Sequence, residues 1–256
     1  MQKKIVILEV PFDQVTLETA VKKVEEMIES EGQFQIATPN PEMVLEARKN
    51  EKFLHLLQKT ELNIPDGIGI VWASKWLKFR GKDDSLPQRV TGTDLMEKIL
   101  KKSTESSSHL FQKKVFLLGA AEGVAKKTKE IFEKKFPDIQ ITGFESGTPD
   151  EKDEEDLIQK INHSQAKILF VAYGAPKQEF WIARNLHKMP LIKIAIGVGG
   201  AFDFFAGIRK RAPDWMQKTG LEWLYRAIQE PRRIKRIYNA VIKFPLAFLF
   251  SSKKKR

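Results

Sequence analysis

The chain has 256 residues, of which 42% are hydrophobic and 30% are charged, a composition typical of a folded globular protein and unlike that of a disordered or fibrous one. It contains no cysteine, which excludes disulfides, thiolate zinc sites and cysteine nucleophiles and fits a reducing compartment. The formal net charge is +11, and the segment from Ala201 to the end holds fourteen Lys or Arg against four Asp or Glu. A basic tail on a nearly neutral body predicts an anionic partner surface, either phospholipid or nucleic acid.

The first apolar run of the chain predicts a strand rather than a signal peptide. Glu9 and Asp13 interrupt this run, and no small-residue cleavage site follows it. No stretch approaches the roughly 18 consecutive apolar residues that span a bilayer, so we expect no membrane-spanning helix. Short apolar runs of strand-forming residues predict seven strands, over residues 5–10, 34–37, 62–64, 115–118, 139–142, 168–172 and 192–196.

Helical patterns alternate with these strands. The first spans residues 16–30, where Thr16 provides an N-cap and apolar residues recur at helical spacing. The alternation predicts an α/β fold, a mostly parallel Rossmann-like sheet with helices on both faces. We expect residues 1–207 to form this core and residues 208–256 to form a basic amphipathic, helical appendage that binds a membrane.

Polar and glycine-rich segments follow five of the predicted strands. In open parallel sheets, ligands bind beyond the carboxyl ends of the strands, so these segments are the candidate site. They are ATPNPE at 37–42, PDGIGI at 65–70, GAAEGV at 119–124, YGAPKQE at 173–179 and GVGGAFDFFAG at 197–207.

Asp66 is the first candidate for chemistry, because it lies between Pro65 and Gly67 directly after an apolar strand. A carboxylate in that position can project into a crevice as a general base or a ligand. An Asp that only stabilises a turn has the same sequence context, and the triplet alone favours that alternative.

Two glycine-rich turns predict close approach of a ligand to the backbone. Residues 119–123 could offer N–H groups to a phosphate or form a packing turn, and they lack the middle glycine of the dinucleotide fingerprint, which argues against a Rossmann oxidoreductase. Residues 197–207 hold three glycines in four positions, which suits a sugar-nucleotide pocket. The alternative is a tight turn whose phenylalanines pack in the core.

The segment 173–181 brings an amide, an ammonium group and a carboxylate together at Gln178, Lys177 and Glu179. These groups could contact a uracil edge, a ribose or a pyrophosphate, or they could cap the helix that follows. The chain has no Asp-x-Asp motif, and its four histidines show no metal-ligand spacing. We therefore expect neither a metal nor a cofactor, so that Arg, Lys and helix N-termini would stabilise a departing pyrophosphate.

Taken together, these segments resemble the WecG/TagA/CpsF family of bacterial glycosyltransferases, glycosyltransferase family 26, over nearly the whole chain. The resemblance implies an inverting, metal-independent transfer from a UDP-sugar, typically UDP-N-acetylmannosamine or its uronic acid, to N-acetylglucosamine on undecaprenyl diphosphate, in cell-wall or surface polysaccharide synthesis. The motifs that carry it are Thr38-Pro-Asn-Pro-Glu42, Asn63-Ile-Pro-Asp-Gly-Ile-Gly69, Arg89-Val-Thr-Gly-Thr-Asp94, Tyr173-Gly-Ala-Pro-Lys-Gln-Glu179, Gly197-Val-Gly-Gly-Ala-Phe-Asp203, Arg211-Ala-Pro-Asp-Trp215, Gly220-Leu-Glu-Trp-Leu-Tyr-Arg226 and Glu230-Pro-Arg-Arg233.

The resemblance also implies roles for individual residues. Asp66 would be the general base that deprotonates the acceptor hydroxyl, with Asp203 as a competing carboxylate. The remaining residues would bind substrate: Thr38 and Asn40 would orient donor or acceptor, Arg89 and Gln178 would contact the donor, and Gly199, Gly200 and Asp203 would line the nucleotide site.

The basic tail carries an apolar stripe at helical spacing and ends in an apolar run, residues 242–250, followed by Lys-Lys-Lys-Arg. Such a segment suits burial at a membrane interface, where each basic residue near an anionic leaflet contributes on the order of 1 kcal/mol. We expect a peripheral protein on the cytoplasmic face of the bacterial plasma membrane. Arg226, Arg232 and Arg233 would complete the active site by contacting the pyrophosphates.

Three alternatives remain open for the tail. It could bind nucleic acid, although an apolar terminus adds nothing to such binding, so we expect no nucleic-acid partner. Its stripe could instead pack on the body of the protein or in a homo-oligomer. A membrane or nucleic-acid adaptor without catalysis is the alternative function, and it leaves the polar strand ends unexplained.

Overall fold

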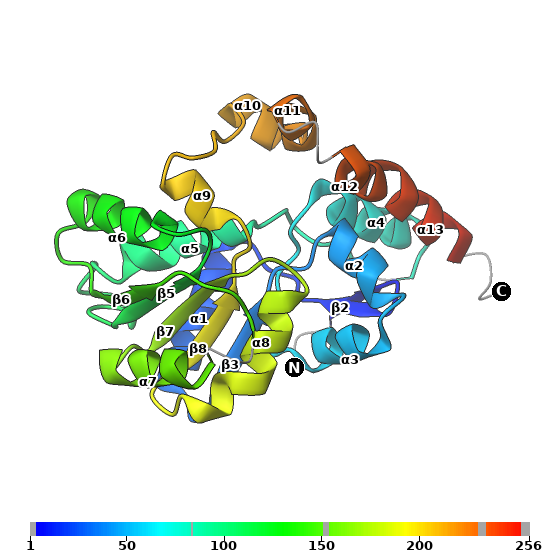
Figure 1. Ribbon diagram of the computed structural model, residues 1–256. Helices are drawn as coiled ribbons and strands as arrows, with labels where there is room; N and C mark the ends of the chain where they lie inside the picture. Colours follow the sequence, from blue (N-terminus) through cyan, green and yellow to red (C-terminus); the bar gives the residue numbers. More distant parts are fainter. Residues whose placement is uncertain (1–3, 83, 151–153, 230–233, 252–256) are drawn as a thin grey trace.

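The computed structural model describes residues 4–82, 84–150, 154–229 and 234–251, and its centre is a six-stranded sheet with helices on both faces (Figure 1). Every neighbouring pair of strands in this sheet is parallel. The predicted α/β fold is therefore confirmed. The strand order is β4 (Leu62–Asn63), β3 (Phe34–Ala37), β8 (Ile194–Gly197), β7 (Ile168–Ala172), β5 (Val115–Gly119) and β6 (Ile141–Glu145).

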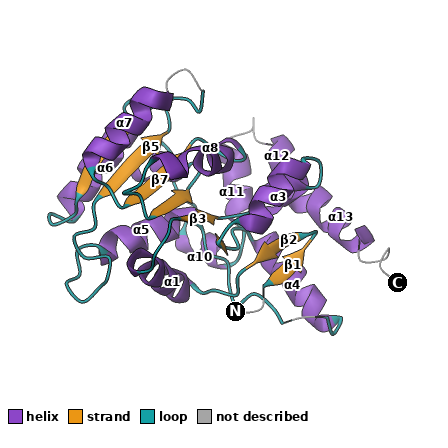
Figure 2. Cartoon of the chain, turned by 90° about the horizontal axis from the view of Figure 1, so that it is seen from below, coloured by secondary structure: helices purple, strands orange, loops and turns teal. Residues whose placement is uncertain are grey.

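Successive side chains along each strand enter different cores, because they point to opposite faces of the sheet. Leu117 and Phe170 face one core, whereas Phe116 and Leu169 face the other. Burial on both faces explains why β5, β7 and β8 are continuous apolar runs. The first face is covered by α1 (Leu17–Glu29), α5 (Gly92–Lys102), α6 (Val124–Lys135) and α9 (Ala201–Phe205), and the second by α7 (Glu154–Ser164) and α8 (Lys177–Asn185). Figure 2 shows α1 and α5 on one side of the sheet and α7 and α8 on the other.

The N-terminal prediction of one strand over residues 5–10 is wrong. Leu8 and Glu9 have φ angles of 48° and 71°, and this left-handed backbone reverses the chain. The result is an antiparallel hairpin of β1 (Ile5–Ile7) and β2 (Val10–Phe12), separate from the main sheet. It packs with α2 (Pro41–Ala47), α3 (Glu51–Lys59) and α4 (Ile68–Phe79) into a third core, which we call the hairpin core.

The basic tail is helical in its described parts, as predicted. It consists of α10 (Asp214–Lys218), α11 (Glu222–Gln229), α12 (Ile234–Tyr238), the π-helix η4 (Asn239–Lys243) and α13 (Phe244–Ser251). From α9 it leads past α10 and α11 to α12 and α13, which lie beside α2 and α4 (Figure 1). Within the described ranges, none of the helices has the length and apolar character needed to cross a membrane.

The end of the tail is anchored on the body by two phenylalanines. Phe244 and Phe248 are buried in the hairpin core, and the ring of Phe248 meets Trp72 of α4 edge to face at 5.9 Å. These two residues of the terminal apolar run therefore pack on the body of the protein. The opposite side of the same helices stays exposed.

Phe244→Ala is expected to lower the free energy of unfolding by about 3–5 kcal/mol, because it removes a fully buried aromatic side chain from a packed core. Urea unfolding measures this change. Phe250→Ala, at an exposed position of the same helix, is the matched control and should change stability little. Equally small losses for both variants would show that α13 does not pack on the body in solution.

Candidate active site

A crevice lies at the carboxyl ends of the sheet strands, where the segments after β3, β4, β5, β7 and β8 converge. Its volume is about 490 Å³. We call it the strand-end crevice. Seven of the predicted site residues line it, namely Thr38, Asn40, Asp66, Gln178, Gly199, Gly200 and Asp203, together with Ala120, Tyr173, Arg209 and Arg236 among others.

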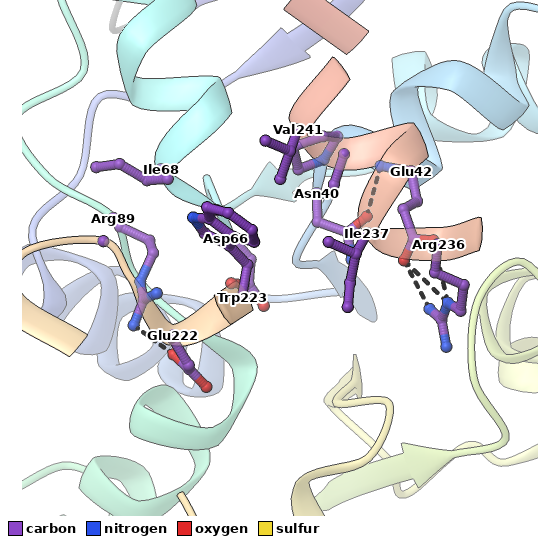
Figure 3. Close-up of a pocket in the computed structure, with 14 residues that line it drawn as sticks. Asn40, Glu42, Asp66, Ile68, Arg89, Glu222, Trp223, Arg236, Ile237 and Val241 are labelled. Atoms are coloured by element: carbon purple, nitrogen blue, oxygen red, sulfur yellow. Dashed lines mark hydrogen bonds and ion pairs between the residues drawn. The ribbon is translucent and has the colours of Figure 1, made fainter. Parts of the chain in front are cut away.

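A second cavity of about 170 Å³ lies between the body and the tail. Figure 3 shows its polar and apolar walls, which come from the start of α2, the start of α4, α11 and the α12–η4 segment. We call it the tail cavity. Its lining residues are Asn40, Pro41, Glu42, Asp66, Gly67, Ile68, Arg89, Gly220, Glu222, Trp223, Arg236, Ile237, Ala240 and Val241.

The two cavities meet at three side chains. Asn40, Asp66 and Arg236 line both of them, so these residues lie at the junction of the strand-end crevice and the tail cavity. Molecules bound in the two spaces would therefore approach each other beside one carboxylate and one guanidinium group. Asp66 and Asn40 were predicted from the strand ends, whereas Arg236 was not.

The loop that carries Asp66 is fixed from two sides. The backbone N–H of Asp66 donates to the carbonyl of Pro39 at 3.1 Å, and that of Val90 donates to the carbonyl of Pro65 at 2.9 Å. Gly67 has a φ of +128°, and a Cβ at this position would lie 2.8 Å from the Pro41 ring. Glycine is therefore required after Asp66, and the carboxylate is held at the edge of both cavities.

Thr38 and Asn40 use their side chains to shape the segment after β3. The hydroxyl of Thr38 donates to the carbonyl of Gly197 at 3.3 Å, which ties the ends of β3 and β8 together. The side-chain oxygen of Asn40 accepts from the backbone N–H groups of Glu42 and Met43, both at 3.0 Å, and so caps α2. This cap fixes the orientation of the Asn40 amide at the junction.

Gln178 forms part of the crevice floor, where it holds two loops together. Its side chain is 2% exposed, and its oxygen accepts from the backbone N–H of Gly174 at 3.1 Å and of Gly199 at 3.0 Å. Its amide nitrogen donates to the buried carboxyl of Glu179 at 2.7 Å. The bonds that position Gln178 thus join the loops after β7 and β8, and its predicted contact with the donor stays a prediction.

Burial raises the pKa of Glu179 to about 7, and the hydrogen bond from Gln178 lowers it only in part. The folded protein therefore keeps a proton that the unfolded chain releases above its ordinary pKa of 4.5. The retained proton stabilises the folded protein fully below pH 4.5. This stabilisation is lost as the pH rises to about 7, which lowers the free energy of unfolding by about 3 kcal/mol.

Glu179→Gln should remove this dependence, because the amide has the same shape and no proton to lose. The difference in unfolding free energy, variant minus parent, is expected to rise by about 3 kcal/mol from pH 4.5 to pH 7. Urea unfolding over this range measures it, with exposed Glu155→Gln as control. A flat difference curve for Glu179→Gln would show that the carboxyl ionises normally in the fold.

Asp203, the competing carboxylate, is paired with a cation. Its side chain lies 3.3 Å from Nε of Arg209, and its backbone carbonyl accepts from the N–H groups of Ile208 and Arg209. Gly200 borders this pair, and Gly199 has a φ of +55° that favours glycine. The turn therefore presents backbone and a guanidinium group, rather than an isolated base, to the crevice.

Arg89 lies on the wall of the tail cavity, where it forms a largely buried ion pair with Glu222 of α11 at 2.9 Å. A second ion pair joins Arg211 to Asp94 of α5 at 2.6 Å. Burial alone would raise the pKa of Asp94, but the hydrogen bonds from Arg211 and Thr91 outweigh it and lower the pKa. Together the two ion pairs hold the first part of the tail against the body.

Of the tail arginines predicted to meet the pyrophosphates, Arg232 and Arg233 lie outside the described residues, as does the side chain of Arg226. Arg236 is the described guanidinium group at the junction. It forms a bidentate pair with Glu42, with distances of 2.8–3.1 Å (Figure 3). Arg236 belongs to the same basic run as Arg232 and Arg233 in the sequence. Which arginine of this run reaches the site depends on how the tail packs on the body, and the sequence alone does not give that packing.

Metal ligands do not cluster in the part of the chain that the structure describes: no group of three or more His, Asp or Glu side chains is arranged to hold an ion.

Comparison with known proteins identifies relatives along the whole chain. The family described as "Glycosyl transferase WecG/TagA/CpsF family" matches residues 5–256. Three similar proteins are named N-acetylglucosaminyldiphosphoundecaprenol N-acetyl-beta-D-mannosaminyltransferase. That of Bacillus spizizenii is 38% identical over 82% of this chain and 76% of its own. Those of Staphylococcus aureus (strain MRSA252) and Bacillus subtilis (strain 168) are each 34% identical, over 91% and 86% of this chain and 88% and 81% of their own.

Proposed function

The chain belongs to the WecG/TagA/CpsF family and is a glycosyltransferase, and from this premise we propose that it transfers N-acetylmannosamine from a UDP-sugar to N-acetylglucosamine on undecaprenyl diphosphate. The reaction belongs to cell-wall polymer synthesis of the teichoic acid type. We propose that it proceeds with inversion and without a metal ion. The similar proteins named above support the acceptor and the transferred sugar.

One observation supports the mechanism above all others: Asn40, Asp66 and Arg236 line both the strand-end crevice and the tail cavity. A transferase that joins two substrates needs a base where they meet. A general base must come within hydrogen-bond reach of the proton that it removes. Asp66 lies in that position if donor and acceptor occupy the two cavities.

The donor occupies the strand-end crevice in this proposal. The crevice volume of about 490 Å³ lies within the usual range for small-molecule sites, about 300–1,000 Å³. Gly199 and Gly200 let the pyrophosphate approach the backbone, and Arg209 provides a charge beside them. Placement beyond the strand ends is the general rule for nucleotide ligands of parallel α/β sheets.

The acceptor approaches through the tail cavity. Ile68, Trp223, Ile237 and Val241 give this cavity an apolar wall that suits the start of a polyprenyl chain. Arg89, which the sequence predicted to contact the donor, lines this cavity and not the strand-end crevice, so we assign its charge to the acceptor diphosphate. Arg236 lies at the junction, beside the donor. Arg226, Arg232 and Arg233 of the tail would add to that charge.

In the chemical step, the acceptor hydroxyl oxygen attacks the anomeric carbon of the donor as the bond from that carbon to UDP breaks. The hydroxyl proton passes to the carboxylate of Asp66, and the electron pair of the broken bond leaves on UDP. Arg236 stabilises the charge that develops on the departing diphosphate. A single displacement of this kind inverts the anomeric configuration.

The C-terminal segment rests on the anionic cytoplasmic face of the plasma membrane in this account. From Ile234 to the end, the chain has seven Lys or Arg and no Asp or Glu. Exposed apolar side chains occur at every fourth position of this segment, at Ile234, Tyr238, Ile242, Leu246 and Phe250. We call them the tail stripe. Apolar side chains flanked by cations are the pattern of interfacial helices, and a homo-oligomer is the competing way to cover them.

UDP release from a panel of UDP-sugars, with a short-chain lipid-diphosphate N-acetylglucosamine acceptor, tests the proposal. We expect release with UDP-N-acetylmannosamine, dependence on the acceptor, and no loss of rate when a chelator is added. Release that ignores the acceptor would contradict the transfer reaction. A preference for a different UDP-sugar would contradict the proposed donor and leave the proposed transfer reaction in place.

A further inference from the structure

The exposed surface of α4 has the chemistry of a membrane-docking element. Phe79 is 81% exposed, more than any other large hydrophobic side chain among the described residues, and Trp72 is 38% exposed. Single apolar residues are common on protein surfaces, but here Trp72, Trp76 and Phe79 form a ladder of contacting rings with centroids 6.1–6.2 Å apart. This ladder belongs to none of the catalytic features described above.

The charges of this segment are of one sign. From Ile68 to Lys82 the chain contains four basic residues, Lys75, Lys78, Arg80 and Lys82, and no Asp or Glu. All four are exposed, and only Lys78 has a described acidic partner, Asp84 at 3.5 Å. The segment thus repeats the pattern of the tail, from Ile234 to the end, which also lacks acidic residues.

The two segments are neighbours although residues 83–233 separate them in the chain. Trp72 contacts Phe248 of α13, and a Cβ on Gly69 would lie 3.5 Å from the Phe244 ring. Figures 1 and 2 both show α4 beside α13, and the two helices are in contact. The helix starts at Ile68 on the wall of the tail cavity, and at 1.5 Å per residue Phe79 lies about 16 Å further along it.

We propose that α4 is a second membrane-docking element, in which Trp72 and Phe79 enter the headgroup region of an anionic bilayer while Lys75, Arg80 and Lys82 contact lipid phosphates. The proposal rests on the proposed membrane-linked acceptor. Aromatic side chains favour the membrane interface, and cations beside them add attraction to anionic lipid. Together with the tail, α4 would bring the mouth of the tail cavity to the surface from which the lipid acceptor comes.

Site-specific labelling tests this surface directly, because the chain has no cysteine of its own. Phe79→Cys, Leu246→Cys on the tail stripe and Leu191→Cys as an exposed control away from α4 would each carry a nitrobenzoxadiazole label. With vesicles of phosphatidylglycerol and phosphatidylcholine in equal parts, we expect a blue shift at positions 79 and 246 and none at 191. Vesicles of phosphatidylcholine alone should give a smaller shift.

A shift at 246 without one at 79 would overturn the proposal and leave docking by the tail in place. No shift at either position would overturn both membrane claims, while UDP release with a soluble acceptor would still test the transferase. A shift at 79 that appears with rising protein concentration in the absence of vesicles would show that a second copy covers α4, which also overturns it.

Charge reversal gives an independent measurement. The triple variant Lys75→Glu, Arg80→Glu, Lys82→Glu should lower vesicle partitioning by at least about tenfold. The control Lys126→Glu, Lys127→Glu, Lys134→Glu reverses three exposed cations on α6 with the same change in net charge. Both variants should keep the parent rate on the soluble acceptor, and equal loss of partitioning in both would overturn the proposal.

Discussion

Asp66→Asn is expected to lower kcat by about a thousandfold and to leave the KM of both substrates nearly unchanged, because it removes the proton acceptor and keeps the shape of the side chain. The backbone bond from Asp66 to Pro39 and the Gly67 turn do not involve the carboxylate, so the loop should stay in place. Steady-state rates with a soluble acceptor, in parent and variant, measure the loss.

Asp203→Asn is the matched control, since it changes the second carboxylate of the crevice in the same way. Asp203 is paired with Arg209 beside the glycine turn, so its replacement should act on donor binding and raise the KM of the donor more than it lowers kcat. A larger loss of kcat for Asp203→Asn than for Asp66→Asn would exchange the roles of the two carboxylates.

Arg236→Gln is expected to lower kcat/KM by about a hundredfold, because it removes a charged hydrogen-bond donor from the place where the diphosphate of UDP departs. Arg236 is the described guanidinium group that lines both cavities, and Glu42 holds it there in the absence of substrate. The same rate assay on a soluble acceptor applies.

Lys235→Gln provides the control for this effect, since it removes one charge from the adjacent exposed position of α12. Membrane attraction alone would make the two variants equal, and both would then recover the parent rate on a soluble acceptor. Glu42→Gln frees Arg236 without removing it and should leave activity within a few fold of the parent. A loss as large as that of Arg236→Gln would mean that the ion pair itself is required.

Much of the fold could be predicted from the sequence, because β5, β7 and β8 of the parallel sheet are continuous apolar runs. The runs at 34–37 and 168–172 match β3 and β7 residue for residue. The hairpin was missed since its reversal depends on left-handed φ angles at Leu8 and Glu9, residue types that do not signal a turn.

The strand-end part of the site could be predicted for a physical reason: the carboxyl ends of parallel strands share one edge of the sheet, so residues distant in sequence converge there. The tail cavity could not, because it depends on how a separate helical segment packs. Basic residues in such a segment look alike in sequence. Packing of Phe244 and Phe248 on the body, together with the ion pair to Glu42, places Arg236 at the junction.

The sequence also did not show which apolar residues of the last helical segment are buried. The apolar stretch 242–250 predicts contact with lipid or protein, and the structure packs one part of it on the body and leaves the other part exposed. Phe244 and Phe248 point into the hairpin core, while Ile242, Leu246 and Phe250 remain exposed.

The anomeric configuration of the product tests the central claim most directly, namely that the acceptor hydroxyl displaces UDP in a single step at the meeting point of the two cavities. The parent enzyme would be incubated with UDP-N-acetylmannosamine and the soluble lipid-diphosphate acceptor, and the new glycosidic bond examined by NMR. The account predicts a disaccharide whose new bond has the configuration opposite to that of the donor. A product with the donor's configuration would contradict it.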